Sequence, residues 1–143
     1  LFVSGEALRR VGGLPEEYFL FLEETDWCWN IREAGFRVVH LPEVTLVHLS
    51  GASSRRRDAA AKRIEYHRSL YRFLEKRRGK ATARLVRAQR VAKGLAEVVL
   101  LAPLALLSAG QRRRWGERRR LLAWHLRGRP QGFGLAPLAE ERP

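Results

Sequence analysis

The chain has 143 residues, of which 45% are hydrophobic, and its 28 Lys and Arg residues outnumber its 15 Asp and Glu residues to give a net charge of +13. A single cysteine excludes an internal disulfide, and one cysteine with four histidines at these spacings excludes a zinc cluster built from the chain alone. The charge is divided, because residues 1–54 hold four arginines and eight acids, for −4, whereas the remainder carries +17. We therefore expect two parts with different roles.

Two helices and several strands or extended segments are predicted for the acidic part, and the first of these is a strand that includes residues 1–3. Ser4 can cap a short helix over residues 5–11, and the two glycines that follow can end it. A second helix is predicted from about residue 25 to Gly35. Segments 36–41 and 44–49, which are rich in Val, predict two short strands, and the apolar run 19–22 predicts a buried strand or extended segment. Together these elements are typical of half of an α/β sheet.

Three carboxylates, Glu23, Glu24 and Asp26, follow directly after the apolar run 19–22. Carboxylates crowded beside a hydrophobic wall repel one another and lose hydration, so their proton affinity rises. Such a group can act as a general base that activates a hydroxyl. The alternative is structural, because acids in the first turn of a helix interact favourably with the helix dipole.

Several short motifs occur in an order that resembles a known enzyme family. They are Gly12–Phe19, Phe21–Cys28, Arg32–Phe36, Pro42–Glu43 and Val47–Ser53. These motifs resemble the C-terminal half of the catalytic domain of family 2 glycosyltransferases, and most of all the bacterial rhamnosyltransferase-like branch. The resemblance implies an α/β fold, with the C-terminal part of a GT-A, Rossmann-like domain over residues 1–54 and a helical, basic extension after it. It also implies that the donor-binding half of the enzyme precedes this chain.

In this family a sugar moves from a nucleotide-sugar donor to a hydroxyl of a glycan or lipid-linked acceptor, with inversion at the anomeric carbon. The resemblance implies that Glu24 is the base, at a position where relatives usually carry Asp. It also implies that Glu23 and Asp26 position the base or the acceptor. His48 falls where the resemblance implies a ligand of a divalent ion, Mg²⁺ or Mn²⁺, or a contact to the departing diphosphate. The alternative for His48 is a core or edge histidine, because it shares a predicted strand face with apolar residues.

The segment after His48 is rich in side chains that suit phosphate. Ser53 comes shortly before three consecutive arginines, which include Arg55 and Arg56. Guanidinium groups present forked donors to phosphate oxygens. We therefore expect Ser53, Arg55 and Arg56 to contact the diphosphate of the nucleotide, with a solvated basic loop as the alternative.

The basic part is predicted to be helical. A connecting amphipathic helix is expected within residues 55–80, and a basic, partly apolar helical segment over residues 81–127. Residues 95–109 are almost wholly apolar but, at about 1.5 Å per residue, too short for the ~30 Å of bilayer hydrocarbon. Arginine clusters and tryptophans flank this run, which is typical of a segment that lies in a membrane interface and binds anionic lipid. Residues 128–143 are expected to form a disordered tail.

These patterns favour a fragment of an inverting, metal-dependent glycosyltransferase of cell-envelope polysaccharide synthesis. We expect it to be peripheral, at the cytoplasmic face of the cell membrane. One alternative is a basic nucleic-acid-binding module, which the net charge would suit. The acidic first part and the long apolar run argue against nucleic acid as a partner. The other alternative is a membrane-associating fragment without activity of its own.

Overall fold

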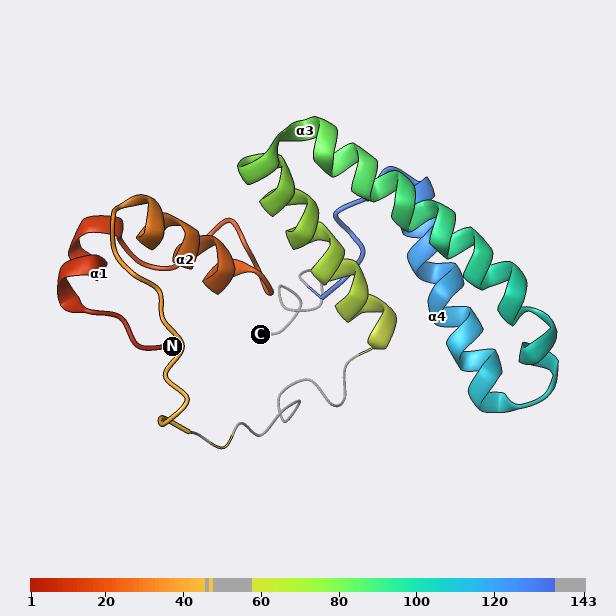
Figure 1. Cartoon of the computed structure of the whole chain (residues 1–143). Coiled ribbons are helices and arrows are strands. Elements are labelled where there is room, and N and C mark those ends of the chain that lie inside the picture. Colours follow the sequence, from red (N-terminus) through yellow and green to blue (C-terminus); the bar gives the residue numbers. More distant parts are fainter. Residues whose placement is uncertain (46, 48–57, 136–143) are drawn as a thin grey trace, which may run out of the picture. The chain divides into compact units, whose positions relative to one another are not determined.

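The computed structural model describes residues 1–45, 47 and 58–135, which belong to two compact units, Leu1–Arg56 and Arg57–Pro143 (Figure 1). Each unit has its own helices and its own buried side chains. Among the described residues, no helix combines the length and the apolar character needed to cross a bilayer.

The first unit contains two helices, α1 (Gly5–Val11) and α2 (Glu23–Glu33). The prediction of a helix over residues 5–11 is confirmed at both ends. The Ser4 hydroxyl oxygen accepts a hydrogen bond from the Ala7 amide at 3.2 Å and so caps the first turn. At the other end Gly12 lies at φ +82°, where a residue with a side chain would be strained, and the helix stops there.

The predicted α/β fold is wrong, because no strand occurs in the parts of the chain that the structure describes. The expected strand 19–22 contains Phe21 at φ +71° and Leu22 at φ +69°, and an extended strand cannot contain such residues. Residues 36–41 and the described part of 44–49 suit a strand by composition, but they pair with no other segment. A strand needs a neighbouring strand to take its backbone hydrogen bonds, and the described residues form no such pair here. The expected half of a GT-A sheet is therefore not what the described residues form.

The second unit begins with a long helix, α3 (Ala59–Leu101). Asp58 caps it, because one carboxylate oxygen accepts a hydrogen bond from the Ala60 amide at 2.8 Å. The helix is kinked at Gly79, which lies at φ +84°, and its ribbon turns sharply there (Figure 1). The first helical stretch of α3 thus ends at Gly79, within the range 55–80 expected for the connecting helix.

A short 3₁₀ turn, η1 (Pro103–Leu106), leads from α3 into α4 (Ala109–Leu126), which runs back along the second half of α3 (Figure 1). Pro103 ends the hydrogen-bonding pattern of α3 because it has no amide proton. The apolar run 95–109 is therefore divided between the end of one helix, a turn and the start of the next. The fold of this unit is a helical hairpin.

The buried centre of the second unit is aromatic. Ile64 and Tyr71 of α3 pack with Trp124 of α4, and each is only 1% exposed. The segment after α4 returns to the first half of α3, where the Arg68 guanidinium donates to the backbone carbonyl of Gln131 at 3.3 Å. Leu135 is buried there at 1% exposure. The expected tail from residue 128 onward is thus described up to residue 135, and that part packs on α3.

Candidate functional site

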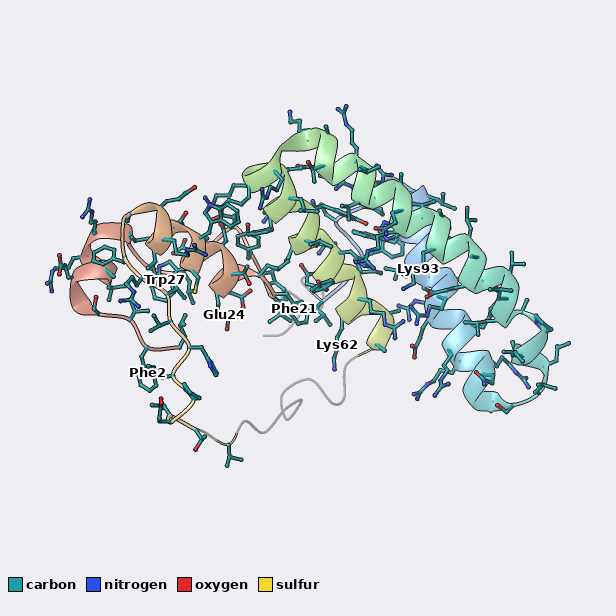
Figure 2. All side chains as sticks on the ribbon, viewed as in Figure 1. Phe2, Phe21, Glu24, Trp27, Lys62 and Lys93 are labelled. Carbon is teal, nitrogen blue, oxygen red and sulfur yellow. The ribbon has the colours of Figure 1, made fainter. Side chains whose placement is uncertain are left out.

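The three acids stand at the N-terminal end of α2, which begins at Glu23 and therefore two residues earlier than predicted. Glu23, Glu24 and Asp26 all lie in its first turn, as the helix-dipole interpretation had it. Figure 2 shows Glu24 at this end of the helix and Trp27 further along it. The acids do not follow a strand end, because the preceding segment is not a strand.

The three acids lie on two different faces of the first turn of α2. Residues three apart share a helix face, so Glu23 and Asp26 point to one side and Glu24 points away from them. Asp26 is completely buried, and one carboxylate oxygen of Glu23 is buried without a hydrogen-bond partner among the described residues. Glu24 is exposed to solvent. Of the three, Glu24 is therefore the most exposed carboxylate, whereas Glu23 is partly buried.

The backbone immediately before the acids is strained. Phe21 and Leu22 both lie in the left-handed region, which costs a non-glycine residue of this size about 1–3 kcal/mol. Leu22 is the N-cap of α2, and it has no side-chain oxygen with which to accept a hydrogen bond from the first amides of the helix. Strain of this kind is found most often where it sets the geometry of a binding or catalytic site.

Trp27 holds α2 against the end of α1. Its indole Nε1–H donates to the Gly12 carbonyl at 2.9 Å, and the ring is 8% exposed. Ile31, one turn further along the same face, is also buried. Trp29 instead donates to the Glu33 carboxylate at 2.7 Å along the outside of the helix. The acid-bearing end of α2 is thereby fixed within the first unit.

The other residues predicted for the site, His48, Ser53, Arg55 and Arg56, lie outside the described residues. Within the described ranges no three His, Cys, Asp or Glu side chains are grouped so that they could hold a metal ion. The residues of α2 therefore do not fit a divalent ion by themselves, although an orphaned carboxylate oxygen such as that of Glu23 is the kind of ligand that Mg²⁺ prefers.

Sequence reasoning missed a polar cluster in the second unit. His67 of α3 and His125 of α4 are both buried, with ring centroids 5.2 Å apart. Neither ring nitrogen of His125 has a hydrogen-bond partner among the described residues, and the same is true of Nδ1 of His67. His67 also stacks on Tyr71 at 6.1 Å. In the sequence His67 lies within the expected connecting helix, but no signal pairs it with His125.

Both buried imidazoles are held neutral. Burial lowers the pKa of His67 to about 4, assisted by His125 and by the positive charges of Arg90 and Arg63. Burial likewise lowers the pKa of His125 to about 4, and three nearby arginines act in the same direction. The pair is thus a neutral part of the core at pH 7.

Comparison with known proteins gives one kind of relative. Two proteins of Mycobacterium tuberculosis, from strains CDC 1551 / Oshkosh and ATCC 25618 / H37Rv, carry the name N-acetylglucosaminyl-diphospho-decaprenol L-rhamnosyltransferase. Each is 35% identical to this chain over 77 residues, which is 54% of the chain and 25% of the relative. The match therefore spans about a quarter of the length of these relatives. No family model matches the chain, and no solved structure matches it significantly. The similarity supports a relationship to a glycosyltransferase.

Proposed function

We propose that this chain is part of an inverting glycosyltransferase of the family 2 type, which acts in cell-envelope synthesis. The proposal is supported by the similarity to rhamnosyltransferases, together with the motif order of residues 1–54. The structural observation behind it is the exposed Glu24 carboxylate in the first turn of α2, directly after two left-handed residues. Backbone strain is more frequent at functional sites than elsewhere, which supports a role for this acid in addition to its interaction with the helix dipole.

In the proposed reaction Glu24 takes the proton of an acceptor hydroxyl as that oxygen attacks the anomeric carbon of the donor sugar. The bond from the anomeric carbon to the nucleoside diphosphate breaks on the opposite side, so the configuration inverts. Glu23 and Asp26 lie on the neighbouring face of the same turn, where they position this end of α2. A general base in such a position typically contributes about 10² to 10⁴ in rate.

The substrates follow from the same relationship. We propose a nucleotide-linked sugar as donor and a lipid-linked glycan as acceptor, at the cytoplasmic face of the cell membrane. Ser53, Arg55 and Arg56 would contact the diphosphate, and His48 would contact the diphosphate or a Mg²⁺ or Mn²⁺ ion held largely by residues elsewhere in the protein.

The test is sugar transfer by the longest natural form of the protein that contains this chain. Nucleotide-linked rhamnose and two other nucleotide sugars are offered with an N-acetylglucosaminyl-diphospho-lipid acceptor, and the products are separated and their anomeric configuration is determined. We expect one donor to give a product of inverted configuration. A product of retained configuration, or no transfer from any donor although nucleotide sugar binds, would refute the proposal.

A further inference from the structure

The hairpin of the second unit ends in an apolar surface that the unit itself does not cover. The hairpin tip consists of residues 95–114, which are the end of α3, η1 and the first turns of α4 (Figure 1). Six large apolar side chains of the tip are exposed: Leu95 (48%), Val99 (69%), Leu100 (71%), Leu104 (38%), Leu106 (84%) and Leu107 (75%). Single exposed leucines are ordinary on a protein surface, but six large apolar side chains exposed within one short stretch at the end of a hairpin are typical of an interaction site.

Basic side chains follow these leucines in the chain, on the first turns of α4. Arg112, Arg113 and Arg114 are all exposed on the first turns of α4. Arg113 pairs with Glu117 at 3.6 Å, whereas Arg112 and Arg114 form no ion pair with a described residue. Two guanidinium groups are therefore available to anions near the base of the apolar surface.

The tip is held in shape by contacts between the two helices. The Trp115 indole N–H of α4 donates to the Val98 carbonyl of α3 at 2.9 Å, and Arg118 pairs with Glu97 at 3.1 Å. Further from the tip, Leu122 packs so closely on Gly94 that an added Cβ there would lie 3.4 Å from it. The leucines of the tip are presented by a braced hairpin, so their exposure is not the result of a loose end.

We infer that the hairpin tip inserts into the surface of an anionic lipid bilayer, with its leucines in the acyl-chain boundary and its arginines at the lipid headgroups. Apolar side chains gain free energy only where they leave water, and a bilayer offers hydrocarbon at one depth and negative charge just above it. A nucleic acid would satisfy the arginines but would leave the leucines in water. The order of leucines at the end and arginines behind them therefore favours lipid. This inference rests on the second unit alone and does not depend on the proposed enzymatic activity.

The experiment uses the whole chain of 143 residues and vesicles of phosphatidylcholine, with or without phosphatidylserine. Leu106→Asp combined with Leu107→Asp removes the two most exposed leucines of the tip. Leu85→Asp is the matched control, because Leu85 is 72% exposed on α3 but lies outside the tip. Arg112→Gln combined with Arg114→Gln removes the two unpaired charges. All four side chains of the tip variants are exposed, so the helical content should stay that of the wild type, and circular dichroism checks it.

We expect the leucine variant to bind anionic vesicles at least about tenfold more weakly, since burial of two leucines is lost, and Leu85→Asp to change binding less than about twofold. The arginine variant should lose roughly tenfold on anionic vesicles and little on neutral ones. Unchanged vesicle binding by the leucine variant would overturn the inference. So would a wild-type chain that ignores anionic vesicles while it binds duplex DNA equally well with and without the leucine substitutions.

A second measurement reports insertion directly. The chain has one cysteine, Cys28, so Cys28→Ser followed by Leu106→Cys allows an environment-sensitive dye to be placed on the tip. The dye should shift to shorter emission wavelength on addition of anionic vesicles, whereas the same dye after Leu85→Cys should not. Equal shifts at both positions, or no shift at either, would contradict insertion of the tip.

Discussion

The buried pair His67 and His125 should make the stability of the second unit fall between pH 7.5 and pH 5, a range above that in which carboxylates usually titrate. Both imidazoles have a pKa of about 4 in the folded chain and an ordinary value of 6.5 when exposed. Because the folded pKa is lowered, the unfolded chain binds more protons between pH 6.5 and pH 4, and stability falls as the pH falls. One pKa unit corresponds to about 1.4 kcal/mol, so each histidine should lower the free energy of unfolding by about 2 kcal/mol between pH 7.5 and pH 5. The two together should lower it by about 4 kcal/mol.

The free energy of unfolding can be measured by urea denaturation followed by circular dichroism, because α3 and α4 supply most of the helix in the described chain. His67→Phe and His125→Phe should each remove about half of the fall between pH 7.5 and pH 5. His40→Gln is the control, because His40 belongs to the first unit and has no place in the buried pair. A wild-type chain whose stability is flat over this range, or a fall that survives both Phe substitutions, would show that the two imidazoles are not buried and neutral.

Three further predictions concern single positions. Gly134→Ala should lower the free energy of unfolding of the second unit by more than about 1 kcal/mol, because Gly134 lies at φ +114° and the added Cβ would be 2.9 Å from the Glu65 carboxylate. Gly132→Ala is the control and should have little effect, because there is open space around Gly132. Equal urea midpoints for the two variants would refute this prediction. Trp27→Phe should destabilise the first unit by about 1 kcal/mol through loss of its hydrogen bond to α1, measured as faster hydrogen exchange in α2, and unaltered exchange would contradict it. His48→Ala in the longer protein should weaken metal dependence or nucleoside-diphosphate binding. Titration curves that superimpose on those of the wild type would return His48 to the core-histidine interpretation.

Local signals predicted the helices better than they predicted the fold. The helix over residues 5–11 was predicted correctly because its cap and its ending glycines act within a few residues. The strands at 36–41 and 44–49 were predicted from composition, but strand formation depends on a distant partner that composition does not supply. At Phe21 and Leu22 the backbone takes the left-handed conformation, which residues with large side chains disfavour, and no sequence pattern predicts it.

For the candidate site, too, the sequence predicted the local features but not those that depend on distant contacts. The acids at 23, 24 and 26 were identifiable from their spacing, and the structure adds which of them is exposed and which is buried. The pairing of His67 with His125 could not be predicted, since it depends on how α4 returns along α3 after 57 residues of intervening chain. The apolar run 95–109 was predicted to be a membrane-interface segment, which stays a prediction, and its division by Pro103 into a hairpin tip became visible only in three dimensions.

The central claim, that Glu24 is the base of a sugar transfer, is tested most directly by the initial rate of transfer by Glu24→Gln in the longest natural form of the protein. Glu6→Gln is the matched control, because Glu6 is the second residue of α1 as Glu24 is of α2, and both are exposed first-turn acids. The account predicts that Glu24→Gln lowers turnover by about 10² to 10⁴ with nucleotide-sugar affinity nearly unchanged, while Glu6→Gln behaves as the wild type. If Glu24→Gln keeps more than about a tenth of the wild-type turnover, Glu24 is a helix-dipole acid like Glu6 and another group is the base.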